Sequence, residues 1–133
     1  MDLVDALGQL SFEVQGALAE IAGKHDLSLV QTRLLGVLRD REPTMQELGR
    51  HLGLDKSSVT GLVLRAQRRG LVIRTASELD RRSAHVIITE DGLRLASAVA
   101  DEFARWIAAN VAAVLAPAEQ RELTRLVKKV LSS

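Results

Sequence analysis

The sequence predicts a mainly α-helical protein with one small β-hairpin. Hydrophobic residues make up 47% of the 133 positions and aromatic residues 2%, and most of the apolar residues are leucine, alanine and valine. Leucine and alanine lose little free energy when they enter a helix. After Gly70 the helical spacing of apolar residues gives way to two short runs rich in valine and isoleucine, which favours paired strands. A chain of this length is expected to form a single domain.

The first two helices are predicted from the spacing of apolar residues. Between Leu3 and Ile21 apolar residues recur every three or four positions, so they line one face of a helix that Gly23 ends. The same spacing from Leu29 to about Asp40 predicts the second helix.

Two capped helices follow. Thr44 can cap the first of them, over residues 45–51, because its hydroxyl can accept from free N–H groups while Glu47 reaches back to the cap's own amide. Gly53 ends this helix, since glycine readily adopts the left-handed conformation found at helix ends. Asp55 can cap the next helix, whose dipole favours a negative group at that end.

The hairpin and the last two helices complete the chain. Residues 71–73 and 85–89 predict two strands joined by a polar, charged segment. A two-stranded hairpin is marginal in water, so we expect it to pack against the preceding helices. Thr89 can cap a long helix from Leu93 to about residue 115, and Pro117 suits the first turn of a last helix.

This order of elements predicts a winged helix-turn-helix. A short helix, a glycine turn and a capped helix form a helix-turn-helix, and the hairpin directly after it adds the wing. We expect residues 27–89 to form this lobe, and residues 1–24 and 91–133 to form a helical dimerisation region. The first and last helices each carry an apolar stripe that a monomer of this size would leave partly uncovered, which favours a homodimer.

Basic residues are concentrated in the middle of the chain. The formal net charge is only +1 overall. Residues 1–30 carry one basic and five acidic residues, a balance of −4, whereas residues 56–85 carry seven basic and two acidic residues, a balance of +5. A local basic patch of this kind is typical of nucleic-acid binding, and a solvated arginine-rich face is the alternative.

The predicted recognition helix follows Asp55 and has two faces. The apolar face, which is expected to be buried, holds Val59, Leu62, Val63 and Ala66. The candidate DNA-binding residues, at the helix start and on the other face, are Lys56, Ser57, Ser58, Thr60, Gly61, Arg65 and Arg68. Ser57, Thr60 and Arg65 suit base edges in the major groove, where Gly61 would let the backbone approach closely. Lys56 and Arg68 suit phosphates, and helix capping or simple solvation is the alternative for the three hydroxyl residues.

The tip of the hairpin supplies the candidate wing residues Asp80, Arg81 and Arg82. A guanidinium at this place could enter a narrow minor groove, whose negative potential attracts it. Asp80 is expected to pair with an arginine or to cap the turn, which would hold the wing in shape. A solvated charged turn is the alternative.

The sequence contains no recognisable catalytic or metal site. The absence of cysteine excludes disulfides, thiolate-bound zinc and thiol catalysis. No glycine-rich phosphate loop and no nucleophile elbow occurs, so neither an enzyme nor a cofactor is expected. His25, His51 and His85 are scattered, with only the weak pair Asp26 and Glu47 nearby, so no metal ion is expected.

The sequence also gives expectations for the cellular location of the protein and for an effector ligand. The first ten residues are acidic where a secretory leader would be basic, and no apolar run approaches the ~18 residues of a membrane span. We therefore expect a soluble cytoplasmic protein with no membrane contact. Phe103 and Trp106 could line an effector pocket, although aromatic residues at helical spacing favour core or dimer interface.

These residues resemble the MarR family of bacterial transcription regulators. The resemblance is carried by residues 44–63, by residues 69–72, by Asp80-Arg81-Arg82 and by the run Ile88-Thr89-Glu90-Asp91-Gly92. It implies a homodimer built from the first and the last two helices, with recognition helices in successive major grooves of double-stranded DNA and wings in the flanking minor grooves. It also implies a repressor that responds to small aromatic or phenolic compounds bound between the dimerisation helices and the DNA-binding lobe.

Two features depart from the family pattern. The family often has charged residues at the positions of Gly61 and Leu64, so direct base contacts are expected to be fewer. The family's oxidant sensors use a cysteine in the first helix, which this chain lacks. A different class of function stays open from the sequence alone: a winged-helix module for protein contacts in an assembly, with the basic face serving an acidic partner.

Overall fold

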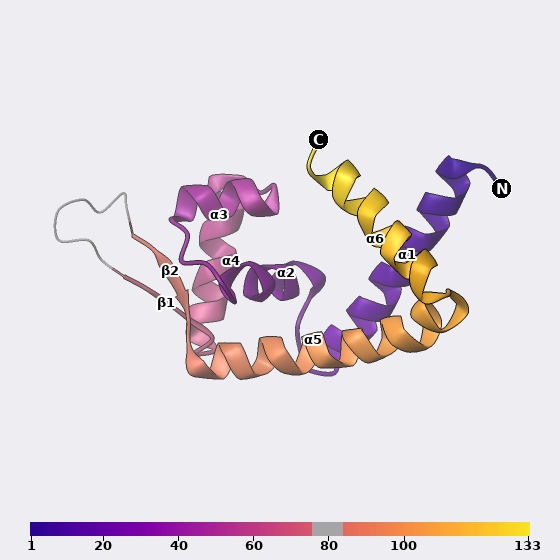
Figure 1. Cartoon of the computed structure of the whole chain (residues 1–133). Helices are drawn as coiled ribbons and strands as arrows, with labels where there is room; N and C mark the ends of the chain where they lie inside the picture. The colour runs from indigo at the N-terminus through magenta and orange to yellow at the C-terminus, as the bar shows by residue number, and fades with distance from the viewer. Residues whose placement is uncertain (76–83) are drawn as a thin grey trace. The chain divides into compact units, whose positions relative to one another are not determined.

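The computed structural model describes residues 1–75 and 84–133 of the chain (Figure 1). Its elements, in order, are α1 (Leu3–Gly23), α2 (Leu29–Leu38), α3 (Met45–Leu52), α4 (Lys56–Arg68), β1 (Val72–Arg74), β2 (Val86–Ile88), α5 (Glu90–Asn110), the 3₁₀ turn η2 (Ala112–Val114) and α6 (Pro117–Leu131). The strands pair antiparallel. The predicted fold, mainly helical with one small hairpin, is therefore confirmed. The chain divides into two compact units, residues 1–100 and 101–133, each of which is described by itself.

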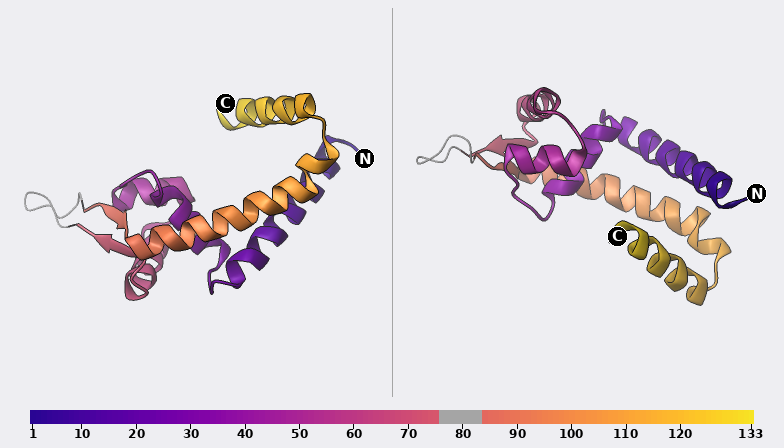
Figure 2. Two further views of the ribbon diagram at one scale, coloured as in Figure 1. Left: turned by 60° about the horizontal axis from the view of Figure 1, so that its bottom comes forward. Right: turned by 90° about the horizontal axis from the view of Figure 1, so that it is seen from above.

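The long helix α5 differs most from its prediction. It begins at Glu90, three residues before the predicted start, and ends at Asn110, five residues before the predicted end. The early start follows from the cap, because the carbonyl of Thr89 already accepts the first helical hydrogen bond, from the N–H of Leu93 at 2.8 Å. At the other end α5 stops at Asn110, and the next residue, Val111, has φ −117° and ψ −60° and precedes the 3₁₀ turn η2. Figure 2 shows α5 as one continuous helix that follows the hairpin.

The core of the first unit lies among α2, α3, α4 and the hairpin. Helix α4 packs against α3 and β1, and β2 packs against α2. The largest fully buried side chains are Leu34, Leu35, Leu38, Leu48, Leu62, Val59, Val63, Val72 and Val86. Every buried side chain among residues 1–75 and 84–133 is apolar, so burial of these leucines and valines is what holds α4 in place.

The base of the hairpin is anchored to the loop before α3. Val72 pairs with Ile88 and Arg74 with Val86 across the two strands. The N–H of Val86 also donates to the carbonyl of Pro43 at 2.8 Å. The Nδ1 atom of His85 lies 2.6 Å from the carbonyl oxygen of Glu42. These bonds fasten the start of β2 beside the N-terminus of α3, so the hairpin and the helix-turn-helix form one structure.

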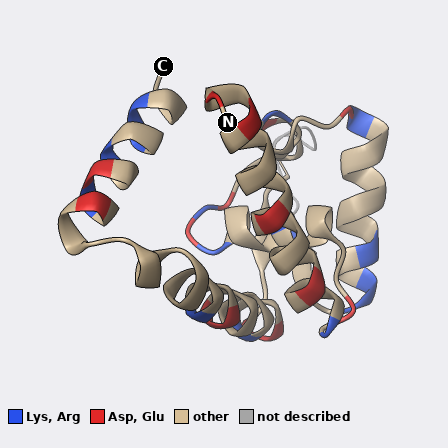
Figure 3. Cartoon of the chain, turned by 90° about the vertical axis from the view of Figure 1, so that its right-hand side faces the viewer, with Lys and Arg blue, Asp and Glu red and all other residues tan. Residues whose placement is uncertain are grey.

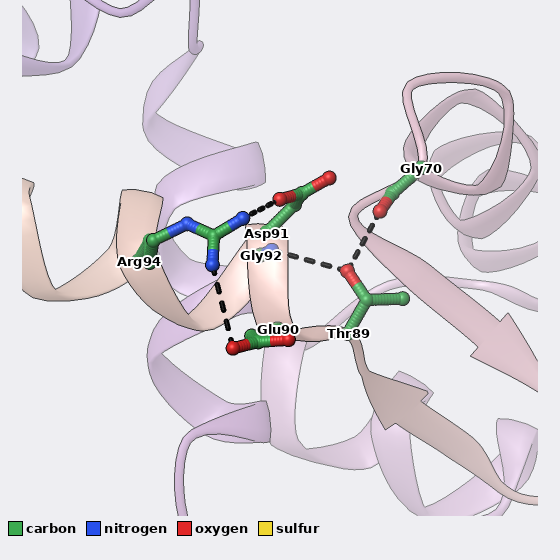
Figure 4. Close-up of polar contacts among 6 residues, drawn as sticks. All are labelled: Gly70, Thr89, Glu90, Asp91, Gly92 and Arg94. Carbon is green, nitrogen blue, oxygen red and sulfur yellow. Dashed lines mark hydrogen bonds and ion pairs between the residues drawn. The ribbon is translucent and has the colours of Figure 1, made fainter.

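Helix α5 begins against the end of α4 through Thr89 and Gly92 (Figure 4). The Thr89 hydroxyl donates to the carbonyl of Gly70 at 2.6 Å and accepts from the N–H of Gly92 at 3.1 Å. A Cβ atom on Gly92 would lie 2.2 Å from the carbonyl oxygen of Leu71, so only glycine fits there. Arg94 pairs with Asp91 and Glu90 on the first turn. Thr89 and Gly92 of the Thr-x-x-Gly motif thus allow close packing between the hairpin and the start of α5.

Two helices keep apolar faces that their own unit leaves exposed. On α1, in the first unit, the exposed apolar residues are Leu3, Val4, Leu7, Leu10 and Phe12. On α6, in the second unit, they are Leu123, Leu126, Val127, Val130 and Leu131. No residue of α6 is buried. Within the described ranges, the structure contains no helix that is both long and apolar enough to cross a membrane.

Candidate nucleic-acid interface

Helix α4 buries one face and exposes the other, as its sequence predicts. Val59, Leu62, Val63 and Ala66 are buried. The exposed residues on the rest of the helix are Lys56, Ser57, Ser58, Thr60, Leu64, Arg65 and Arg68, and Gly61 is half-buried. Figure 3 shows basic residues at both ends of α4 and acidic residues along α1. The outward face of α4 is therefore accessible to a partner, although DNA contacts by these residues stay a prediction.

The start of α4 is held by Asp55. Its Oδ1 atom accepts from the N–H of Ser58 at 2.8 Å and from the hydroxyl of Ser57 at 3.0 Å. The hydrogen bond from the Ser58 backbone is the largest cause that lowers the pKa of the Asp55 carboxyl from its ordinary value, and the two serine hydroxyls lower it further. Ser57 and Ser58 thus complete the helix start, as the capping alternative predicts for them.

The hydroxyl of Thr60 also bonds within the helix. It donates to the carbonyl of Lys56 at 2.8 Å, one turn earlier. With their hydroxyl protons used inside the protein, Ser57 and Thr60 present only lone pairs outward in this conformation. They could accept from the exocyclic amines of adenine or cytosine, which are the donors of the major groove.

The two arginines predicted on the outward face lie one turn apart. A Cβ atom added to Gly61 would lie 3.2 Å from the Nη1 atom of Arg65. The Arg65 side chain therefore extends back along the helix surface, toward the helix start. Both arginines are exposed, and within residues 1–75 and 84–133 neither forms an ion pair. They provide positive charge that no described carboxylate neutralises.

Arg69 has a structural role that sequence reasoning missed. Its Nη1 donates to the carbonyl of Asp26 at 2.7 Å, and its Nη2 donates to the carbonyl of His25 at 3.1 Å. These carbonyls belong to the turn after α1, where Asp26 has a left-handed φ of 55°. The guanidinium thus ties the end of α4 to the end of α1. The sequence carries no signal of this contact, because the acceptors are backbone atoms 43 and 44 residues away.

The predicted wing residues Asp80, Arg81 and Arg82 lie outside the described residues, which stop at Thr75 and resume at Ala84. Their predicted role in the minor groove therefore stays a prediction. The described part of the hairpin is its base, where β1 pairs with β2 and the N–H of Val86 bonds to the carbonyl of Pro43 in the loop between α2 and α3.

The remaining candidate residues are described by the contacts within their own unit. The Nδ1 atom of His51 lies 3.3 Å from the Arg41 guanidinium. Among the described residues no three His, Asp or Glu side chains gather as a metal site. In the second unit the rings of Phe103 and Trp106 stack, with centroids 6.5 Å apart and planes 5° from parallel, and both are half-buried. Whether these rings belong to the core, to a dimer interface or to an effector pocket stays a prediction.

Comparison with known proteins connects this geometry to a group of regulators. The sequence pattern that describes the MarR family matches residues 25–83. The chain is 26% identical over 130 residues to the HTH-type transcriptional regulator PecS of Dickeya dadantii, covering 95% of this chain and 76% of PecS. It is 36% identical over 58 residues to the organic hydroperoxide resistance transcriptional regulator of Bacillus subtilis, covering 44% of this chain. That match spans 40% of the length of the Bacillus regulator.

Solved structures agree over nearly the whole chain. A MarR family protein from Bacillus stearothermophilus aligns with a TM-score of 0.86 and 25% identity, covering 98% of this chain and 91% of that one. Two further structures share the fold at lower identity: a Staphylococcus aureus MepR variant bound to an oligodeoxyribonucleotide, with a TM-score of 0.69 and 19% identity, and NadR in complex with 4-hydroxyphenylacetate, with a TM-score of 0.81 and 21% identity. They cover 99% of this chain each, and 97% and 91% of their own chains. These findings do not favour the protein-interaction module left open by the sequence.

Proposed function

We propose that the chain is a transcriptional regulator of the MarR family that binds specific sites in double-stranded DNA. The observation that carries the proposal is the outward face of α4. It presents Lys56, Arg65 and Arg68 to solvent while the opposite face is buried in the core of the winged-helix unit. A helix anchored in this way can enter a major groove as a rigid element. The proposed function includes no catalytic step, and we propose that the protein acts in the cytoplasm.

Within this proposal the residues of α4 divide by chemistry. Arg65 contacts a base edge, since a guanidinium can donate two bonds to guanine. Lys56 and Arg68 contact phosphates, which set register and supply salt-dependent affinity. Ser57, Ser58, Thr60 and Gly61 line the groove side of the helix. Asp80, Arg81 and Arg82 form the wing, with Arg82 directed to the minor groove.

The protein is proposed to act as a homodimer. The support is the exposed apolar face of α6 and the similar face of α1, which burial against a second copy would remove from water. Dimers also match the two half-sites of a symmetric operator. Sedimentation should give a dimer for the wild type and a monomer for Val130→Glu, which places a charge in the apolar face. Lys128→Glu, on the opposite side of α6, is the control and should stay dimeric. A wild-type monomer at micromolar concentration would contradict the proposal.

A small aromatic compound is proposed as effector, acting to release the DNA. The support is the family resemblance and the similar fold of NadR, which was solved with 4-hydroxyphenylacetate. A compound that shifts both the melting temperature and the DNA affinity would qualify, because ligand binding to the folded state raises its stability by mass action.

Binding titrations at several salt concentrations test the proposed function. A duplex from the protein's own promoter and a random duplex of equal length are compared. We expect the affinity for both to fall steeply with salt, and the promoter duplex to bind more tightly at every salt concentration. Equal and weak binding to every duplex would refute specific DNA recognition.

Variants of Arg65 and Arg82 separate base contacts from charge. Arg65→Lys keeps the charge, so the salt slope should stay while discrimination against a changed base pair falls by about 1–3 kcal/mol. Arg82→Ala should weaken binding to the promoter duplex while sedimentation still gives a dimer. An unchanged affinity for Arg82→Ala would remove the wing from the mechanism.

A further inference from the structure

Two residues on the outward face of α4 have identities that folding does not explain. Leu64 is 44% exposed on a face that is otherwise polar or basic, whereas Leu62 on the buried face is 1% exposed. The core therefore uses one of these two leucines and leaves the other in solvent. A lone exposed leucine is ordinary on a protein surface, so the neighbouring position decides what it means.

That neighbour is Gly61, which lies inside the helix. Glycine in a helix interior is unfavourable relative to alanine. A Cβ at Gly61 would approach only the Nη1 atom of Arg65, the movable end of a long side chain, at 3.2 Å, and Gly61 is not among the residues with positive φ. Nothing in the fold requires glycine at this place. Gly61 and Leu64 together form a short apolar strip on the outward face of α4. Gly61 contributes backbone without a side chain, and Leu64, three residues later, contributes an exposed isobutyl group.

The chemistry of the major groove supplies one partner for such a strip. Base edges there present donors and acceptors, and the apolar group among them is the C5-methyl of thymine. The basic residues Lys56 and Arg68 on the same helix carry positive charge that suits the flanking phosphates. With no side chain at Gly61 the backbone can approach the bases closely, which brings the side chain of Leu64 to the depth of the methyl groups.

Resting on the proposed entry of α4 into the major groove, we propose that Leu64, over the gap left by Gly61, packs against the C5-methyl group of a thymine in each operator half-site. Leu64 is then a specificity-determining residue. It selects a T·A pair at one position by apolar contact, in place of the charged contacts that the family pattern offers at these two positions.

The size of the effect follows from burying one methyl group. The transfer free energy of a single buried carbon corresponds to a loss of about fourfold in affinity when one methyl is removed. If both half-sites of a dimer lose it, and the two losses are independent, the affinity should fall about fifteenfold.

Replacement of thymine by deoxyuridine is the direct test, because it removes the methyl and keeps every hydrogen-bonding group. An operator is first selected from a random duplex library with the wild-type full chain. Each thymine of the selected operator is then replaced in turn by deoxyuridine, and binding is measured for wild type, Leu64→Ala and Leu93→Ala. Leu93 is the matched control, since it is 42% exposed on α5.

We expect one thymine per half-site at which deoxyuridine weakens wild-type and Leu93→Ala binding about fourfold. Leu64→Ala should bind the thymine operator more weakly and should lose sensitivity to deoxyuridine at that position alone. Circular dichroism should show an unchanged fold, because the Leu64 side chain is outside the core.

Three results would overturn the inference while the proposed function stands: no uridine effect at any position for the wild type, a uridine effect that persists unchanged in Leu64→Ala, or an equal loss by Leu64→Ala on operator and random duplex. Failure of the wild type to select any operator would instead overturn the proposed function, and this inference with it.

Discussion

Gly92 is the position at which a single methyl group should do most damage to the fold. Gly92→Ala would place a Cβ 2.2 Å from the carbonyl oxygen of Leu71 and 2.8 Å from Cγ1 of Ile88, whereas ordinary van der Waals contact begins near 3.4 Å. Relief requires a separation of roughly 1 Å between the start of α5 and the hairpin. The hydrogen bond from the Thr89 hydroxyl to Gly70 spans the same junction and would be stretched (Figure 4).

The cost can be worked from these contacts. Overpacking of a tight site costs about 1–3 kcal/mol, and a strained hydrogen bond about 1 kcal/mol more. The gain in helix propensity from glycine to alanine offsets about 1 kcal/mol, so the net loss should be about 1–3 kcal/mol. That is a large part of the total stability of a small domain, which is roughly 5–15 kcal/mol.

Urea unfolding followed by circular dichroism, at one fixed protein concentration, measures this loss. Gly36→Ala in α2 is the matched control, because a Cβ there meets nothing within 4 Å. It should gain about 0.5–1 kcal/mol from the same change in helix propensity. If the two variants have equal stabilities, the close approach at Gly92 does not constrain the fold and the reasoning is refuted.

Two further predictions test the ends of α4. Arg69→Gln removes the charge and the two hydrogen bonds to the turn after α1, so urea unfolding should give a loss of about 1 kcal/mol, while the salt slope of DNA binding should stay unchanged because no phosphate contact is lost. A smaller salt slope would mean that Arg69 contacts a phosphate instead. Asp55→Ala removes the cap of α4 and should be less stable than wild type near pH 7. Because folding lowers the pKa of Asp55, this deficit is present above the ordinary aspartate pKa of about 3.9 and should shrink as the pH falls through the lowered pKa. A deficit that grows on acidification in thermal unfolding would contradict the role of the ionised carboxylate.

Local features of the fold could be predicted because their signals lie within a few residues. Thr44 accepts from the N–H of Glu47 at 3.2 Å, as its place before an apolar run indicates. Asp55 and Thr89 cap their helices for the same reason. The buried face of α4 follows from its helical spacing alone. The outward face, with its basic residues and its unexplained Gly61, could be listed in advance as well.

Two features close to their own signals could nevertheless not be predicted. The end of α5 at Asn110 has no glycine or proline signal at that residue, so the apolar period continued past it in the prediction. The sequence predicts the bonds of the Ser57 and Thr60 hydroxyls at the helix start only as an alternative to DNA contacts, because a serine or threonine hydroxyl can rotate toward the helix or toward solvent.

By itself the sequence determined which segments are helices and strands, where α3, α4 and α6 begin, and which side of α4 is apolar, since capping and periodicity act over a few residues. The tertiary structure alone decided that Arg69 binds the carbonyls of the turn after α1, and that Gly92 is required by the carbonyl of Leu71. Both depend on which backbone atoms meet after the chain has folded, and no local pattern of side chains encodes those distances.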